Sequence, residues 1–335
     1  MPIIEVHGLT KSFRTARREP GLRGAFRGLF SRKYETVTAV RDVGFSIEEG
    51  EFVGFLGPNG AGKTTTLKML AGLLYPTSGT AKVLGYTPWE RKDGYRRQFA
   101  LVLGQKNQLW WDLPAKESFE LNAKIYGLDL PRFNQTVDEL SELLNVKDKL
   151  TTAVRELSLG ERMKCELIAS LLHEPKVLFL DEPTIGLDVV SQKVVREFLR
   201  AHNRRRKTTI VLTSHYMADI QELCERVIII DKGALFFDGK LSTVLDRFAG
   251  SKIVTISLEK QVGEGQCDMT RFGEVIEKTE SQIKLKVPRE RVIATCKALL
   301  DELPVKDFSV EEVPIEDIIR QVFQREEPAA VPAPK

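Results

Sequence analysis

One stretch decides how this chain folds: Gly57-Pro58-Asn59-Gly60-Ala61-Gly62-Lys63-Thr64, which fits the pattern G-x-x-x-x-G-K-[ST]. The apolar run 52–56 precedes it and a helical pattern over 63–73 follows it, so a strand, a glycine-rich loop and a helix are expected in that order. The backbone N–H groups of such a loop surround a polyphosphate, and the positive N-terminal end of the helix strengthens the attraction. These eight residues and Thr65 are therefore predicted to bind ATP or GTP.

Four side chains in two motifs carry the expected chemistry. Lys63 should reach the β and γ phosphates, and the Thr64 hydroxyl should ligate Mg²⁺. Residues 177–180 read as a buried strand that is followed by Asp181 and Glu182. Carboxylates at the end of a buried strand cost free energy unless cations or hydrogen bonds meet them. Asp181 is thus predicted to bind Mg²⁺, directly or through water, and Glu182 to polarise the attacking water.

The composition narrows the class of protein. Of the 335 residues, 42% are hydrophobic and 29% charged, which is typical of about two globular domains. The net charge of +3 is too small to indicate a nucleic-acid binder. The longest apolar runs are far shorter than the roughly 18 to 20 residues that cross a bilayer, and no secretory signal is visible. We therefore expect a cytoplasmic location and reduced structural cysteines, which are Cys165, Cys224, Cys267 and Cys296.

The sequence pattern changes near residue 250. Up to about Asp246, short strand-like runs alternate with helical patterns, which predicts an α/β domain with a largely parallel sheet. Residues 114–150 read as mostly helical. Beyond Gly250, two runs of period two (252–258 and 282–287) and two of helical period (289–303 and 315–323) predict a small α+β domain. The expected strands of the first domain are 52–56, 99–103, 177–180, 208–213 and 227–230.

The motifs together resemble one family. Leu157-Ser158-Leu159-Gly160-Glu161 precedes an amphipathic helical run and lies between the phosphate-binding loop and Asp181, as in the nucleotide-binding subunits of ABC transporters, which this chain resembles over roughly residues 3–245. That family usually reads L-S-G-G-Q here, so Leu159 and Glu161 depart from it. The resemblance implies that Ser158 and Gly160 meet the γ-phosphate. Glu161 adds a negative charge, which either weakens closure or is turned away at the helix start.

Three further residues acquire roles from this resemblance. Gln105, at the end of a strand-like run, resembles the glutamine that senses Mg²⁺ and the attacking water and links the site to the membrane partner. His215 resembles the switch histidine that touches the γ-phosphate. Asp188 resembles the D-loop aspartate that couples two facing sites. Their order along the chain, rather than any one residue, makes the resemblance specific.

The N-terminal region leaves two questions open. The family stacks an aromatic ring on adenine, and the spacing to Ala39 favours Tyr34 over its rival Phe13. Residues 14–33 look inserted between the first strand and Tyr34, and they carry a local charge of +6 against −3 in the rest of the chain. Apolar residues recur at helical spacing over 22–30, so the insertion is either a membrane-proximal amphipathic helix or a solvated loop.

The resemblance also implies an architecture. The expected fold is that of a P-loop NTPase, an ABC cassette with an α/β core, an antiparallel β subdomain and a helical subdomain at about 106–172, within a nucleotide-binding domain of residues 1–248. Residues 249–325 are expected to form an α+β accessory or regulatory domain, and the Pro- and Ala-rich tail 326–335 to be disordered.

The implied mechanism needs partners. Two subunits, identical or related, enclose ATP and Mg²⁺ head to tail, and hydrolysis drives separate permease subunits from the cytoplasmic face of the membrane. Of the adjacent Trp110 and Trp111, one is expected in the core and the other at the permease contact. The motif wording is most similar to that of bacterial drug and viologen exporters. An importer ATPase is one alternative, and an ABC ATPase acting on DNA or ribosomes, which would bind nucleic acid, is another.

Overall fold

The computed structural model describes residues 2–16, 34–104, 106–214, 216–248, 250–259, 269–279 and 281–313. The chain divides into two compact units, one reaching Gly239 and the other beginning at Lys240. The described residues form three sheets, two in the first unit and one in the second. Among the described residues no helix is long and apolar enough to cross a membrane.

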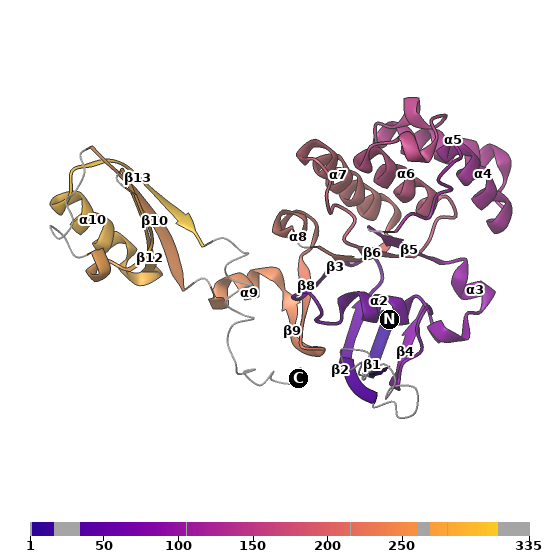
Figure 1. Cartoon of the computed structure of the whole chain (residues 1–335), viewed down its shortest axis with the longest axis horizontal. Helices are drawn as coiled ribbons and strands as arrows, with labels where there is room; N and C mark the ends of the chain where they lie inside the picture. The colour runs from indigo at the N-terminus through magenta and orange to yellow at the C-terminus, as the bar shows by residue number, and fades with distance from the viewer. Residues whose placement is uncertain are drawn as a thin grey trace, which may run out of the picture. The chain divides into compact units, whose positions relative to one another are not determined.

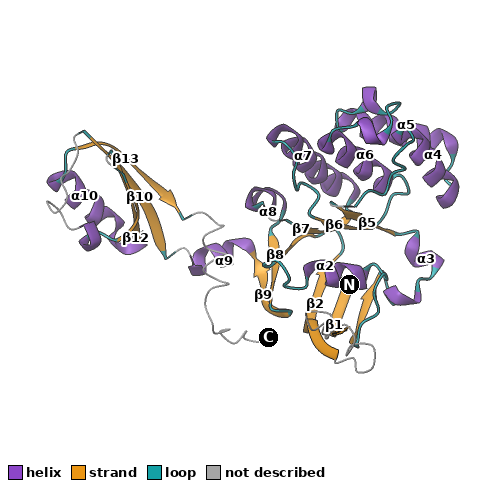
Figure 2. Ribbon diagram, viewed as in Figure 1, coloured by secondary structure: helices purple, strands orange, loops and turns teal. Residues whose placement is uncertain are grey.

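The central sheet of the first unit has six strands in the order β5-β6-β7-β3-β8-β9 (Figure 2). The pairings of β5 with β6, β6 with β7, β7 with β3 and β3 with β8 are parallel. Parallel strands with every residue buried, as in β6 and β7, need a continuous apolar run, which is the pattern that the sequence shows. The bounds are β3 Phe52–Leu56, β5 Phe99–Leu103, β6 Val177–Asp181, β7 Thr209–Thr213, β8 Arg226–Asp231 and β9 Ala234–Lys240.

A second, antiparallel sheet has the order β2-β1-β4. Its strands are β1 Pro2–Ala16, β2 Tyr34–Glu48 and β4 Ser78–Val83. The helix α2 (Lys63–Leu70) shares one buried core with strands of both sheets. Residues 14–16, expected at the start of the insertion, continue β1 and pair with residues 34–36. The remainder of that insertion, with its expected amphipathic helix, lies outside the described residues.

Helices form a separate layer in the first unit. In Figure 1, α4 (Ala115–Tyr126), α5 (Leu130–Leu143), α6 (Leu159–Leu171) and α7 (Val189–Arg206) lie together above the central sheet. This agrees with the helical pattern read over 114–150. Two shorter helices are also described in this unit, α3 (Asp93–Arg96) and α8 (Met217–Leu223). Trp110 and Trp111 are both exposed, by 57% and 45%, so the expectation that one of them enters the core is wrong; the neighbouring Leu109 is the buried residue.

The second unit begins with α9 (Leu241–Phe248) and contains an antiparallel sheet of order β11-β12-β10-β13 with α10 (Val292–Glu302) packed against it. Its strands are β10 Ser251–Leu258, β11 Glu274–Lys278, β12 Gln282–Pro288 and β13 Val305–Glu312. The expected strands 252–258 and 282–287 match β10 and β12. The strands β11 and β13 were not predicted, because most of their residues are exposed and polar and the period-two signal is weak. The expected helix 315–323 and the tail lie outside the described residues.

Candidate functional site

The phosphate-binding loop joins the end of β3 to the start of α2. Gly62 has φ 104°, and a Cβ there would lie 2.4 Å from the carbonyl oxygen of Ala39 in β2. Only glycine combines this backbone angle with such a close approach. Lys63 Nζ donates to the carbonyl oxygens of Gly57 (2.6 Å) and Pro58 (3.1 Å), so the ammonium group is held over the loop. This is the position from which a lysine can reach a bound phosphate.

Two opposing effects act on the pKa of Lys63. Its side chain is buried, and burial lowers the pKa of the ammonium group. The nearby carboxylates of Glu182 and Asp181 oppose this shift by favouring the charged form. The pKa nevertheless remains below its usual value, so an additional negative group such as a phosphate would stabilise the positive charge further.

The acid residues lie at the carboxyl end of β6. Thr64 Oγ1 donates to Asp181 Oδ2 (2.8 Å), and Thr213 Oγ1, at the end of β7, donates to Asp181 Oδ1 (2.7 Å). Glu182 follows with φ 56°, a left-handed angle that is uncommon outside glycine and frequent at functional sites. Thr64, Asp181 and Glu182 line one cavity of about 160 Å³, together with Lys68, Leu103, Gly104 and Lys106.

The loop that carries Gln105 starts directly against these acids. Gly104 N donates to the carbonyl oxygen of Asp181 (2.8 Å), and a Cβ on Gly104 would lie 2.1 Å from the carbonyl oxygen of Glu182. Glycine is therefore required immediately before Gln105. Gln105 and His215 themselves lie outside the described residues. Their roles stay predictions. Of the residues that precede them, Gly104 contacts Asp181, and Ser214 donates a hydrogen bond to Asp219.

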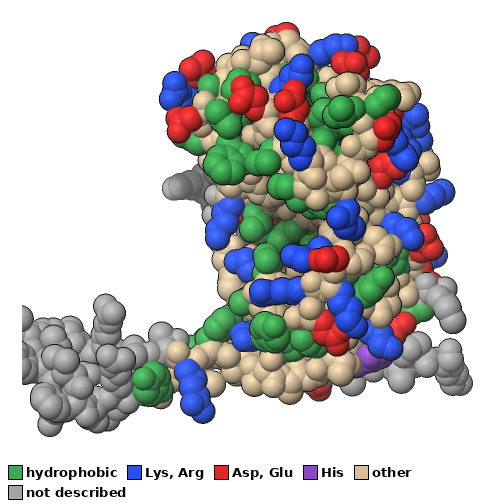
Figure 3. Space-filling view, turned by 90° about the vertical axis from the view of Figure 1, so that its right-hand side faces the viewer, with side chains coloured by type: hydrophobic (Ala, Val, Ile, Leu, Met, Phe, Trp, Pro, Cys, Tyr) green, Lys and Arg blue, Asp and Glu red, His purple; other side chains and the backbone are tan. Residues whose placement is uncertain are grey.

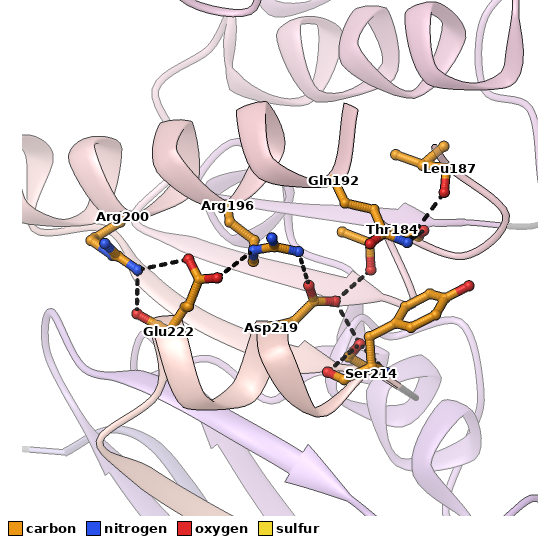
Figure 4. Close-up of polar contacts among 9 residues, drawn as sticks. Thr184, Leu187, Gln192, Arg196, Arg200, Ser214, Asp219 and Glu222 are labelled. Atoms are coloured by element: carbon orange, nitrogen blue, oxygen red, sulfur yellow. Dashed lines mark hydrogen bonds and ion pairs between the residues drawn. The ribbon is translucent and has the colours of Figure 1, made fainter. Parts of the chain in front are cut away.

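A buried carboxylate that was not predicted from the sequence connects the segment after β6 with the segment after β7 (Figure 4). Asp219, on α8, accepts hydrogen bonds from Thr184 Oγ1 and from Ser214 Oγ (2.7 Å), and it pairs with Arg196 of α7 (3.2 Å). Arg196 also pairs with Glu222 (3.1 Å). Asp219 is fully buried and thus fixes Thr184, which follows the acid cluster, relative to the residue before His215. In the sequence, the one feature that could have pointed to Asp219 is its position as an acidic residue four places after His215.

The signature pentapeptide forms the start of α6. Ser158 is the N-cap, and Glu161 completes a capping box: Ser158 N donates to Glu161 Oε2 (2.9 Å), while Glu161 N donates to Ser158 Oγ (3.3 Å). The backbone N–H of Ser158 is the main reason why the pKa of Glu161 is lowered, and the Ser158 hydroxyl adds to it. Of the two readings of Glu161, the structure therefore favours the one in which its carboxylate folds back at the helix start.

Gly160 and Asp188 meet inside one chain. A Cβ on Gly160 would lie 2.5 Å from Ser191 Oγ, so α6 and α7 touch at this glycine. Asp188 caps α7 by accepting from Ser191 N (2.9 Å), and the bonding to Ser191 lowers the pKa of its carboxyl group. Gly160 is buried, whereas Ser158 and Asp188 are exposed. Of these three residues, the two exposed ones are available to another molecule.

The two candidate adenine residues lie at different heights on the β1–β2 hairpin. Phe13 pairs with Val37, two residues from Ala39, which touches the phosphate-binding loop at Gly62. Tyr34 pairs with Ala16 and lies five residues from Ala39, which at about 3.3 Å per residue is roughly 16 Å along the strand. Both rings are exposed, by 38% for Phe13 and 60% for Tyr34.

A parallel sheet whose carboxyl edge carries a phosphate-binding loop, a threonine hydroxyl and a strand-end aspartate and glutamate defines a P-loop nucleoside triphosphatase. Comparison with known proteins identifies the family. Residues 40–185 match the model of the ABC transporter family. The ABC transporter ATP-binding protein NatA of Bacillus subtilis is 35% identical over 233 residues, which cover 70% of this chain and 94% of NatA. This chain belongs to the ATP-binding subunits of ABC transporters and is an ABC-type ATPase.

Other relatives agree with this assignment. Nod factor export ATP-binding protein I of Burkholderia orbicola is 34% identical over 67% of this chain and 73% of its own length. The probable multidrug ABC transporter ATP-binding protein YbhF of Escherichia coli is 38% identical over 62% of this chain, which spans only 36% of YbhF. A solved ATP-binding subunit of an ABC transporter superposes with a TM-score of 0.61 at 26% identity, covering 73% of this chain and 93% of that one. The expected cassette fold is thereby confirmed.

Two further similarities concern the C-terminal part of the chain and a cassette that is a dimer. Residues 250–311 match the C-terminal domain of EvrA-like ABC transporters. A dimeric ATP-binding cassette in a post-hydrolysis state, bound to ADP and Pi, has the same fold, with a TM-score of 0.60 at 23% identity over 71% of this chain and 98% of that one.

Proposed function

We propose that this chain hydrolyses ATP as one half of a cassette dimer and drives export through separate permease subunits. The observation that carries the proposal is the cluster of Thr64, Asp181 and Glu182 around one small cavity beside the lysine of the phosphate-binding loop. Glu182 borders this cavity and is the group to accept a proton from the attacking water. The named functions of relatives, which include Nod factor export and linearmycin resistance, support the direction of transport.

The same cluster fits Mg²⁺. Thr64 Oγ1 and Asp181 Oδ2 are hard oxygen donors 2.8 Å apart, at the edge where the phosphates would lie. Among the described residues no group of three or more His, Cys, Asp or Glu side chains could hold a metal alone. This suits an ion that keeps several waters and is shared with phosphates. When bound, Mg²⁺ would neutralise charge on the β and γ phosphates, with Thr64 and Asp181 as its protein contacts and Gln105 as a further one.

We propose a dimer because Ser158 faces solvent in one chain. Ser158 is exposed at the N-terminal, positive end of α6, which suits a γ-phosphate held by a second subunit. Directly after Asp188, Val189 and Val190 are exposed by 77% and 72%, an unusual exposure for adjacent apolar residues. A second subunit that covers this segment would remove them from water. Related cassettes with the same fold are dimeric.

The proposed permease contact is an apolar patch beside the segment that follows Gln105. Its exposed members are Trp110, Trp111, Leu113, Leu121 and Ile125. Figure 3 shows the face that is on the right in Figure 1, where α4 lies, and exposed hydrophobic side chains are interspersed there with basic and acidic ones. Exposed tryptophans of this kind mark protein interfaces. Binding to a permease here would hold the subunit at the cytoplasmic face of the membrane.

The adenine contact and the second domain complete the proposal. The register of the hairpin favours Phe13, rather than Tyr34, as the ring that stacks on adenine, because Phe13 is nearer to the phosphate-binding loop. Residues 249–325 are proposed to regulate the cassette; of these, residues 250–311 match the C-terminal domain of EvrA-like ABC transporters.

The substitution Glu182→Gln tests the mechanism. We expect turnover to fall by about 10²- to 10⁴-fold, since a general base is lost. ATP should remain bound, and a stable dimer should appear on size-exclusion chromatography. Lys63→Ala is the matched variant that should lose nucleotide affinity before any dimer forms. Full hydrolysis by the glutamine variant would contradict the role of Glu182.

Transport direction and partner class need a separate experiment. Co-purification from membranes should recover integral membrane proteins, and reconstitution with them should move substrate outward. Inward movement would favour the importer alternative. Co-purification with nucleic acid or ribosomes in place of membrane proteins would favour the non-transport alternative.

A further inference from the structure

A buried carboxylate in the middle of the signature helix has no role in the chemistry described above. Glu166 lies on α6, two turns after the N-cap Ser158, and only 4% of it is exposed. Burial raises the pKa of this carboxyl group, and hydrogen bonds from backbone N–H groups partly oppose the shift. A glutamate in such a place costs free energy unless it makes a specific contact.

The contact that Glu166 makes is with the loop between β5 and α4. Its Oε1 accepts from the backbone N–H of Gln108 (2.7 Å) and from that of Leu109 (3.2 Å). Its Oε2 is buried and has no hydrogen-bond partner within the described part of the chain. One carboxylate oxygen thus holds two consecutive amides of the loop, and hydrogen bonds to a charged acceptor in a buried place are stronger than neutral ones.

This loop joins the two regions that must communicate. It begins after Gly104, which contacts the acid cluster, and it ends with the exposed Trp110 and Trp111. Arg162 lies one turn before Glu166 on the same face of α6, and its guanidinium group lies 5.5 Å from the centre of the Trp111 ring. Two neighbouring positions of α6 therefore hold the same short segment.

We propose that Glu166 is a positioning residue that makes the segment 108–111 and the signature helix move as one body. Displacement of the tryptophans by a partner would then reach Ser158, and closure of Ser158 on a nucleotide would reach the tryptophans. The inference rests on the proposed role of Ser158 at the nucleotide of a second subunit. It differs from that role in assigning the connection to one carboxylate and two amides.

The tryptophans provide a direct readout. The chain has three, and replacing Trp89 with Phe leaves Trp110 and Trp111 as the only reporters. In this background, combined with Glu182→Gln to prevent turnover, ATP should shift the tryptophan emission. Glu166→Ala should abolish most of the shift, while the affinity for ATP changes by less than about threefold, because the phosphate-binding loop is intact. Glu166→Gln keeps an acceptor oxygen at the same length and should retain the shift.

Three further variants separate the loss of this contact from a general loss of structure. Ser170→Ala, one turn after Glu166, removes a hydroxyl that donates only to the carbonyl oxygen of Leu167, and it should behave as the parent. Gln108→Pro removes the nearer amide donor from the loop side and should reproduce Glu166→Ala. Gln108→Ala keeps that amide and is its control. In enzymes with Glu182 intact, Glu166→Ala should lower kcat about tenfold with little change in KM.

The outcomes are distinct. An unchanged emission shift in Glu166→Ala, or its equal loss in Glu166→Gln, overturns the inference. So does a parent that binds ATP and dimerises without any emission shift. If the parent neither binds ATP nor dimerises, the proposed function itself fails. A thermal melt of each variant identifies any that does not fold, and the Gln108 pair then decides the question from the other side of the contact.

Discussion

On the β1–β2 hairpin, Phe13 lies nearer to the phosphate-binding loop than Tyr34 does. We expect Phe13→Ala to raise the KM for ATP about tenfold, since one base–aromatic stack contributes on the order of 1 to 3 kcal/mol. Tyr34→Ala, at the far end of the hairpin, should leave the KM nearly unchanged. Steady-state kinetics with both variants decides between them. The reverse pattern would assign the stacking to Tyr34.

Glu161 sits where the family usually has glutamine, and its carboxylate is folded onto the N-cap. Glu161→Gln preserves the capping box, so the melting temperature should hardly change. Because the carboxylate folds back onto Ser158, replacing it with a neutral amide should change the affinity of the ATP-driven dimer by less than about twofold, at low and at high salt. Analytical ultracentrifugation in the Glu182→Gln background measures this. A clearly tighter dimer at low salt would show that the carboxylate acts on the γ-phosphate.

Helices α6 and α7 touch at Gly160, and this complicates any test of the signature motif. Gly160→Ala places a Cβ against Ser191 Oγ, so we expect a loss of about 1 to 3 kcal/mol in the free energy of unfolding. Ser191→Ala removes the nearest atom and should recover part of that loss, with a coupling of at least about 0.5 kcal/mol. Urea unfolding of the single and double variants measures it. Additive effects would argue against the contact.

The periodicity of the sequence did not show that α6 contacts α7, or that it contacts the loop at residues 108–109. Helical spacing identifies which face of α6 is apolar, yet it cannot say that Gly160 meets Ser191 or that Glu166 meets the amides of Gln108 and Leu109. These partners are far apart along the chain. Only the packing of the helical layer brings them together.

The two units of the molecule have separate cores, one shared by the two sheets of the cassette and one beneath α10. We therefore expect two transitions in differential scanning calorimetry. ATP with Mg²⁺ should raise the melting temperature of the cassette alone. At an ATP concentration a hundred times the dissociation constant, the free energy of unfolding of the cassette should rise by about 2.7 kcal/mol. A chain ending at Phe248 should lose the other transition and still bind ATP. A single transition that shifts as a whole with ATP would contradict this independence.

Local sequence sufficed for the phosphate-binding loop, for the strand-end pair Asp181 and Glu182, and for the strands of the central sheet other than β9, which was not predicted. Each of these depends on neighbouring residues: a glycine-rich turn between a strand and a helix, or a continuous apolar run that ends in charge. The exposure of both Trp110 and Trp111 was misjudged, because alternation along an element gives no information about an irregular loop.

Tertiary structure alone decided which groups support that site. The clamp of Asp219 on Thr184, Ser214 and Arg196 joins residues from three segments, and neither its burial nor its partners follow from any short pattern. The same holds for the nearness of Phe13 to the loop, which depends on the register of the hairpin. The physical reason is that motif chemistry is carried by adjacent backbone, whereas side-chain partners are chosen by how distant segments pack.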